Sequence, residues 1–206
     1  DSVGNKAWDA ITIVYDTTAP VLNILTPQEE LLTNSTQLPI GWNFSDSLTG
    51  VHYVKIMVNG SIIGDHFPAV GDFNITFSSE GTYIITIIAV DWANNSKAVS
   101  IVVHVDWTPP SLQCFVKPRF PSVSDYIHVI VYASDKNGII KVLLVLDNGS
   151  RYMFELYYNL TAGYYEIFLP PMANGTNVTI IVKVYDNAGN VNISPEYTFI
   201  VTGDID

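Results

Sequence analysis

The chain has 206 residues and a net charge of −11, with only nine Lys and Arg residues. Because an acidic surface repels phosphate groups, this composition excludes nucleic acid and anionic membrane surfaces as partners. Only 14% of the residues are charged, yet no apolar run reaches the length of a transmembrane helix and no signal peptide is recognisable. β-branched and aromatic residues are abundant, which predicts strands throughout two domains.

The first predicted element is an N-terminal strand that repeats a segment found later in the chain. Residues 1–20 (DSVGNKAWDAITIVYDTTAP) match residues 91–110 (DWANNSKAVSIVVHVDWTPP) at an offset of 90. A third copy of the turn, residues 186–190, precedes another strand at 197–201. The later copies each close a domain, whereas the first copy has no preceding domain to close. We therefore expect residues 1–19 to form a donor-like strand and linker that needs a sheet elsewhere.

Side chains of this strand alternate between two faces, and both faces are mostly apolar. A strand of this kind is typical of burial within a sheet or sandwich and unlike an exposed edge strand. We expect burial of the donor residues Trp8, Ala10, Ile11, Ile13, Val14 and Tyr15.

Two domains follow the strand, over residues 20–107 and 108–206. In each domain a predicted strand, at 51–58 and at 139–146, ends in Asn-Gly-Ser, which favours a type I′ hairpin turn. Turn signals then recur every 8 to 12 residues. Further strands are expected at 73–77, 81–91, 164–169 and 175–186. About seven short strands per domain predict an all-β protein: two tandem immunoglobulin-like antiparallel β-sandwiches with an extra N-terminal β-strand.

N-glycosylation sequons are far more frequent than chance would produce. Ten of the 16 asparagines begin an Asn-X-Ser/Thr triplet, although Ser and Thr together supply only 31 of the 206 residues. Dense N-glycosylation implies secretion, and it would keep a chain with few charges in solution. The predicted glycosylation sites are Asn34, Asn43, Asn59, Asn74, Asn94, Asn148, Asn159, Asn174, Asn177 and Asn192.

Catalytic chemistry finds no support, and we expect no enzyme activity. The chain contains no HExxH, Gly-X-Ser-X-Gly, P-loop or CxxC motif, and its four histidines are scattered along the sequence. The single cysteine, Cys114, alternates with Leu112 and Val116, which predicts a buried apolar side chain on a strand.

Six aspartates at strand ends raise the alternative of calcium near the domain junctions. The linkers lack a dense carboxylate cluster, and Asp side chains commonly cap turns by accepting hydrogen bonds from nearby amides. We therefore interpret these residues as turn caps and expect no metal site and no cofactor other than glycans. The six residues are Asp16, Asp46, Asp91, Asp106, Asp135 and Asp186.

The chain resembles the tandem Ig-like or fibronectin-III-like repeats of prokaryotic surface proteins. The residues that carry the resemblance are Gly81-Thr-Tyr83 leading into Ala89-Val-Asp91, three Asp-X-X-(Gly/Asn)-Asn turns, and the Asp-X-Thr-X-Pro linkers at 16–20 and 106–110. More narrowly, the orphan strand, the sequons and the lack of disulfides resemble the subunit of archaeal thread filaments. That resemblance implies subunits linked by donor-strand complementation.

Three hypotheses place the orphan strand differently. In the first, the chain is an extracellular filament subunit that donates the strand to the next copy of itself. In the second, it is a spacer or adhesion segment cut from a longer tandem array, whose missing domain lies upstream. In the third, the strand docks on its own first domain. The first residue is Asp, from which we expect a processed chain or a fragment.

Overall fold

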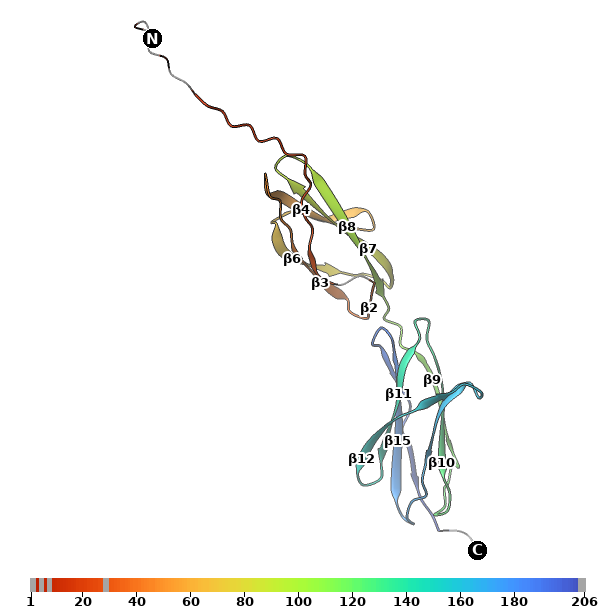
Figure 1. Cartoon of the computed structure of the whole chain (residues 1–206). Coiled ribbons are helices and arrows are strands. Elements are labelled where there is room, and N and C mark those ends of the chain that lie inside the picture. The colour runs from red at the N-terminus through yellow and green to blue at the C-terminus, as the bar shows by residue number, and fades with distance from the viewer. Residues whose placement is uncertain (1–2, 4–5, 7–8, 28–29, 204–206) are drawn as a thin grey trace. The chain divides into compact units, whose positions relative to one another are not determined.

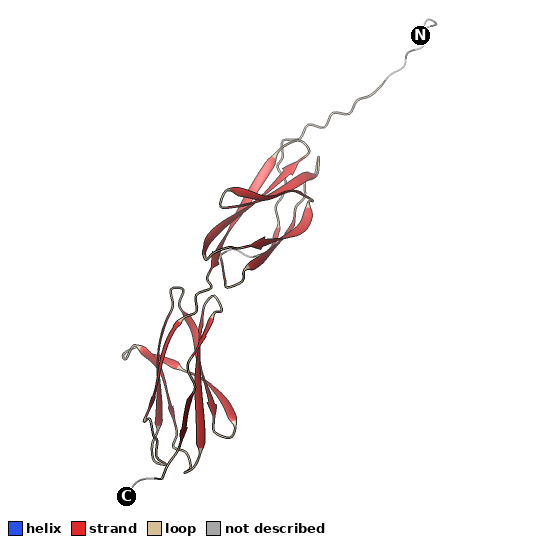
Figure 2. Cartoon of the chain, turned by 180° about the vertical axis from the view of Figure 1, so that it is seen from behind, coloured by secondary structure: helices blue, strands red, loops and turns tan. Residues whose placement is uncertain are grey.

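The computed structural model describes residues 3, 6, 9–27 and 30–203. It contains strands and no helix over this part of the chain, which confirms the predicted all-β class (Figure 2). None of these residues belongs to a helix long and apolar enough to cross a membrane. The chain divides into two compact units, one of residues 1–31 and 35–105, the other of residues 32–34 and 106–206.

Domain 1 is a sandwich of a three-stranded and a five-stranded sheet (Figure 1). The three-stranded sheet has the order β1-β3-β6, in which β3 pairs antiparallel with both neighbours. The five-stranded sheet has the order β2-β8-β7-β4-β5. The strand bounds are β1 Ile24–Thr26, β2 Leu31–Thr33, β3 Gln37–Asn43, β4 Val51–Val58, β5 Ser61–Phe67, β6 Val70–Thr76, β7 Gly81–Asp91 and β8 Ser96–Val105.

Domain 2 is a sandwich of a four-stranded and a five-stranded sheet. The first has the order β13-β14-β10-β9, and the second has the order β12-β11-β15-β16, with β17 also pairing with β15. The last strand is thus divided into two short pieces along β15. The bounds are β9 Ser111–Lys117, β10 Ile127–Ser134, β11 Ile139–Asp147, β12 Arg151–Glu155, β13 Tyr157–Asn159, β14 Tyr164–Leu169, β15 Asn177–Asp186, β16 Val191–Ile193 and β17 Tyr197–Ile200.

Strands form where every second side chain can enter a core. Along β15, residues Val178, Ile180, Val182 and Val184 are fully buried, and the residues between them are partly exposed. This period of two is the one expected for a sheet with one face packed and one face near solvent. The predicted strands 51–58, 81–91 and 164–169 coincide with β4, β7 and β14.

The core of domain 1 is organised around one tryptophan. Trp42 is fully buried on β3, packs edge-on against Phe67 and stacks on Phe44. Its indole N–H donates to the Pro68 carbonyl at 3.0 Å, so the buried polar atom has a partner. No disulfide crosses either sandwich in the described chain, and aromatic and aliphatic packing holds the sheets together.

The two Asn-Gly-Ser turns differ, and the predicted type I′ turn is confirmed only in domain 1. Between β4 and β5, Asn59 and Gly60 have φ angles of 49° and 82°, the two positive values that type I′ requires. In domain 2, Asp147 pairs with Arg151, which leaves a three-residue loop. There only Gly149 has a positive φ, of 99°. The one-residue longer loop changes the turn type, so the prediction is wrong for this hairpin.

Truncating a core side chain should destabilise domain 2 strongly. Leu144 on β11 is fully buried, so Leu144→Ala leaves a cavity and should lower the free energy of unfolding by about 2–5 kcal/mol. Chemical denaturation followed by tryptophan and tyrosine fluorescence measures the loss. The matched control is Leu160→Ala, at a side chain that is 89% exposed, which should change the free energy by less than about 0.5 kcal/mol. Equal losses for the two variants would contradict the assigned core.

Candidate functional site

The N-terminal segment, residues 9–15, presents its apolar side chains to solvent. All seven residues are exposed and none forms a strand. Ile13, for example, is 85% exposed. This finding counts against docking of the strand on its own first domain, and it differs from the predicted N-terminal strand because no sheet lies beside the segment. Of the predicted donor residues, Ala10, Ile11, Ile13, Val14 and Tyr15 are described in this exposed state, and Trp8 lies outside the described residues.

The residue that follows the segment, Asp16, is fixed by hydrogen bonds to neighbouring residues. One Asp16 carboxylate oxygen accepts hydrogen bonds from the Thr18 amide at 2.9 Å and the Thr18 hydroxyl at 2.6 Å. The other accepts from the Thr49 hydroxyl at 2.7 Å, and the Asp16 carbonyl accepts from the Asn95 side chain at 3.1 Å. Exposure therefore begins abruptly at Tyr15, directly before a residue that is fixed to domain 1.

Asp16 belongs to one of two equivalent carboxylate triads, whose six members were named from the sequence but not grouped. In domain 1, one oxygen from each of Asp16, Asp46 and Asp91 lies within 4.8 Å of the others. In domain 2, Asp106, Asp135 and Asp186 repeat the arrangement. The residues of a triad are far apart in sequence, so a search for a dense local acidic motif could not show that they come together. Among the described residues, these triads are the groups that could hold a cation, since calcium prefers carboxylate oxygens.

Hydrogen bonds within each domain confirm the predicted role of these aspartates as turn caps. One Asp46 oxygen accepts from the three amides of Leu48, Thr49 and Gly50 at 2.9–3.0 Å. Asp91 accepts from both the amide and the side chain of Asn95.

In domain 2, Asp186 accepts from Asn190 in the same two ways. Asp106 accepts from the Thr108 amide and the Asn137 side chain, and Asp135 accepts from the Asn137 amide. Each of the six carboxylates therefore caps a nearby backbone amide.

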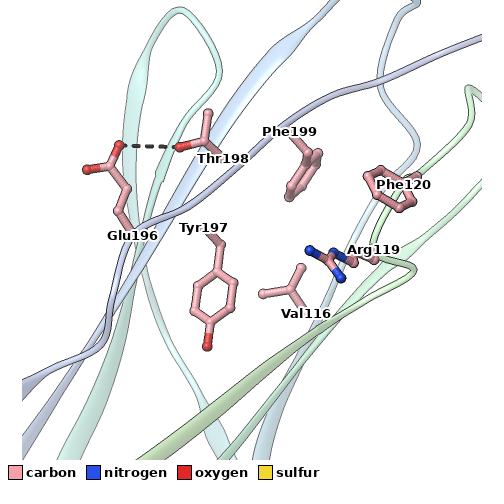
Figure 3. Close-up of a pocket in the computed structure, with 7 residues that line it drawn as sticks. All are labelled: Val116, Arg119, Phe120, Glu196, Tyr197, Thr198 and Phe199. Carbon is pink, nitrogen blue, oxygen red and sulfur yellow. Dashed lines mark hydrogen bonds between the residues drawn. The ribbon is translucent and has the colours of Figure 1, made fainter.

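A groove opens along one edge of the domain 2 sandwich, between β9 and β17. Its cavity has a volume of about 280 Å³. Figure 3 shows Val116, Arg119 and Phe120 on one side and the run from Glu196 to Phe199 on the other. Val116, Tyr197 and Phe199 are partly buried and pack against the domain core, so the floor of the groove is apolar. Among the described strands, β9 pairs only with β10, and β17 pairs only with β15.

Polar contacts join the two sheets of domain 2 beside this groove. A short parallel bridge joins Ser122 to Thr202, with the Val123 amide donating to the Thr202 carbonyl at 2.9 Å. The Tyr197 hydroxyl donates to the Cys114 carbonyl at 2.6 Å. Burial raises the pKa of the Tyr197 phenol, so it stays protonated and remains a donor.

Cys114 lies on β9 beside this groove, and its environment agrees with the predicted role as a core residue. The side chain packs against the domain 2 core. Burial raises the pKa of its thiol to about 11. A thiol with such a pKa carries almost no thiolate near neutral pH, so Cys114 is a poor nucleophile.

All ten sequon asparagines lie where a glycan could reach solvent. Seven are exposed, and three, Asn148, Asn159 and Asn192, are partly exposed. None is buried, although the sequence places several of them in strands. The groove between β9 and β17 is lined by no sequon asparagine. Two other grooves, one in each domain, are lined by Asn74 and Asn148.

Comparison with known proteins gives the fold and no family. No family model matches the chain, and no curated protein matches its sequence. Among solved structures, the fibronectin(III)-like modules of Clostridium thermocellum CbhA align with a TM-score of 0.56 at 18% identity, over 89% of this chain and 95% of that one. The I-band fragment I67–I69 of titin aligns with a TM-score of 0.53 at 10% identity, over 91% of this chain and 66% of that fragment. The chain thus has the fold of tandem Ig-like and fibronectin-III-like domains.

The cap at Asp16 should make domain 1 sensitive to acid. Hydrogen bonds, chiefly from the Thr18 hydroxyl, hold the pKa of the Asp16 carboxyl below its ordinary value of 3.8. The folded state therefore binds this proton less readily than the unfolded state does. The resulting stability is fully present above the ordinary pKa and is lost as the pH falls through the lowered pKa.

Thr18→Val removes the main donor and should raise the pKa of Asp16 towards its ordinary value. The variant should be less stable than the parent near about pH 7, and the difference should be smaller at about pH 3, which is below the ordinary pKa of 3.8. Chemical denaturation at both pH values measures this difference. Thr17→Val, at an exposed neighbour, is the matched control. A stability loss in Thr18→Val that is equal at both pH values would contradict the proposed cause.

Proposed function

We propose that the chain is a structural subunit of a heavily N-glycosylated extracellular filament. Each subunit donates residues 9–15 to the next copy, and no other partner is needed for assembly. The observation that carries this proposal is the exposed apolar segment, which begins directly before the fixed Asp16. A segment with five apolar residues in solvent gains free energy by burial in any sheet that accepts it. The density of exposed sequons supports the extracellular location.

Within residues 10–15 the donor strand has one bulkier face and one smaller face, and Trp8 falls in the register of the smaller face. In an extended conformation Ile11, Ile13 and Tyr15 point to one side, while Ala10, Thr12 and Val14 point to the other. Full burial of one large apolar side chain stabilises a complex by roughly 1.5–3 kcal/mol. The bulky face therefore supplies most of the affinity and enters the acceptor.

The groove between β9 and β17 is the acceptor that the geometry favours. Its floor offers Val116, Tyr197 and Phe199 to the bulky face, and its two walls are strand edges with backbone groups available for pairing. Its 280 Å³ is small for a drug-sized ligand, which occupies roughly 300–1,000 Å³. A row of two or three aliphatic and aromatic side chains suits such a narrow space better. The lack of a lining sequon leaves the groove open to a strand in the glycosylated protein.

Donor and acceptor are different surfaces on each subunit, which determines the kind of assembly. The donor segment precedes domain 1, whereas the acceptor groove belongs to domain 2. A contact between unlike surfaces leaves one donor and one acceptor free at the ends of every oligomer. Unless the rotation between subunits closes a ring, such a contact continues into a filament.

A second candidate function is a spacer or adhesion segment within a longer tandem array. The observation that favours it is the fold itself, since the solved structures with similar folds include tandem modules such as those of CbhA and titin. In that case the segment would pair with a preceding domain of the same polypeptide. A free copy of the segment would then have no reason to bind domain 2 of this chain.

Removing the donor segment should abolish assembly and leave the fold intact. A chain that lacks residues 1–15 keeps Asp16 with its hydrogen bonds, so we expect folded monomers and no filaments. Electron microscopy and analytical ultracentrifugation measure the outcome. Within the full chain, Ile13→Asp should block assembly far more than Thr12→Asp, because only Ile13 lies on the bulky face. Continued polymerisation of the truncated chain would disprove strand donation.

Acceptor function can be tested with a labelled peptide of residues 7–16 and the chain that starts at Asp16. We expect saturable binding, measured by fluorescence anisotropy. Phe120→Asp in the chain should weaken binding at least tenfold, or about 1.4 kcal/mol, because this side chain lines the groove and is 78% exposed, so the fold tolerates the change. Leu160→Asp, at an equally exposed site outside the groove, should leave binding unchanged. Absence of peptide binding to the parent chain would favour the tandem-array function.

A further inference from the structure

Two further grooves, one in each domain, lie at sandwich edges, and a sequon asparagine lines each one. In domain 1 the cavity has about 420 Å³ and is lined by Asn74 together with Ile63, Phe73, Phe77 and Tyr83. In domain 2 the cavity has about 410 Å³, and Asn148 lines it. The other lining residues there include Tyr152, Phe154, Pro170, Pro171 and Met172.

The two grooves lie at equivalent places, although their sequons come from different positions in the fold. In both domains the groove lies beside an edge hairpin, β4–β5 in domain 1 and β11–β12 in domain 2. Asn74 lies on the edge strand β6, whereas Asn148 lies in the loop between β11 and β12. The hairpin position of Asn148 is occupied in domain 1 by Asn59, which also begins a sequon but does not line the groove. In domain 1 the sequon asparagine that lines the groove comes from β6 instead.

The lining of both grooves suits the apolar face of a pyranose ring. Sugars present a face of C–H groups that packs on aromatic rings, while their hydroxyls remain in water. Phe77 and Tyr83 form a tilted aromatic pair with ring centres 4.6 Å apart in domain 1. Tyr152 and Phe154 form a stacked pair with ring centres 6.3 Å apart in domain 2. Phe77 is buried, whereas Tyr83 is partly exposed and Tyr152 is half-exposed, so at least one ring of each pair is accessible at its groove.

We propose that the glycans on Asn74 and Asn148 fold back so that their first pyranose rings occupy these grooves. Each glycan is then an intramolecular ligand that covers the open edge of its own sandwich, in addition to improving solubility. This inference rests on the glycosylation that is part of the proposed function, and it does not depend on strand donation. Covering these edges also prevents another strand from adding there, which leaves the groove between β9 and β17 for the donor.

Nuclear magnetic resonance of the native glycoprotein tests the seating directly. Ring currents of the aromatic pairs should shift the C–H protons of the first sugars on Asn74 and Asn148 upfield. The glycans on Asn43 and Asn177, which line neither groove, should give unshifted signals and are the matched controls. In Tyr152→Ser, at a half-exposed ring, the shift should disappear for Asn148 and persist for Asn74.

Stability supplies a second measurement. Asn74→Gln should lower the denaturation midpoint of the glycoprotein, whereas Asn43→Gln should leave it unchanged. After enzymatic removal of the glycans, the parent and Asn74→Gln should unfold together, since the side-chain change itself is at an exposed site.

Two results would overturn the proposal, and they are distinguishable. Glycans present on Asn74 and Asn148 with unshifted signals, and with no stability difference between Asn74→Gln and Asn43→Gln, would disprove seating and leave the glycosylation intact. Bare asparagines at both positions by peptide mass spectrometry would remove the glycosylation on which the seating depends. Strand donation would stand or fall separately, by the peptide experiment.

Discussion

Open strand edges are the constraint on which the rest of this structure depends. Two sheets that pack face to face leave backbone N–H and C=O groups along the outermost strands, and these groups need a partner or water. Barrels avoid the problem by closing, but a sandwich does not. In domain 2 the edges near β9 and β17 are partly satisfied. A short bridge joins Ser122 to Thr202, and the Tyr197 hydroxyl donates a hydrogen bond to the Cys114 carbonyl. The groove that remains is the natural place for an added strand.

Because the chain is apolar and has few charges, it has few charged side chains with which to protect the open strand edges from pairing with another strand. Proteins commonly protect an edge with lysines, and this chain has only nine basic residues in all. Sequons at Asn74 and Asn148 beside the two other edge grooves offer a substitute, because a bulky polar glycan would cover apolar surface without adding charge. The molecule would thus block strand addition at some sheet edges with glycans, and it would allow strand addition at the open groove between β9 and β17.

Each domain has a carboxylate triad at an equivalent place in its fold. In each, one aspartate comes from the linker, one from a loop between strands and one from the end of a long strand. The backbone carbonyls of Asp16 and Asp106 accept hydrogen bonds from the side chains of Asn95 and Asn190, which fixes each linker to the turn of its domain. At Asp16 this arrangement has a functional consequence, because it separates a fixed linker residue from the exposed residues 9–15.

Sequence alone determined the features that depend on local pattern. The turn signals and the internal repeat predicted strands at 51–58, 81–91 and 164–169, and these have the observed bounds. Turn capping by aspartates was also predictable, because the donor amides lie within four residues. The repeat at an offset of 90 predicted an N-terminal strand, whereas residues 9–15 form no strand in the structure.

Only the tertiary structure decided the features that join residues far apart in the chain. The triad of Asp16, Asp46 and Asp91 and the groove between β9 and β17 exist because the sandwich brings distant segments together. The turn at Asn148 differs from that at Asn59 because the register of β11 and β12 leaves three residues in the loop, which the shared tripeptide could not reveal. The same long-range packing decides which sequon asparagine lines an aromatic groove. The sequence does not show which segments come together to form that groove.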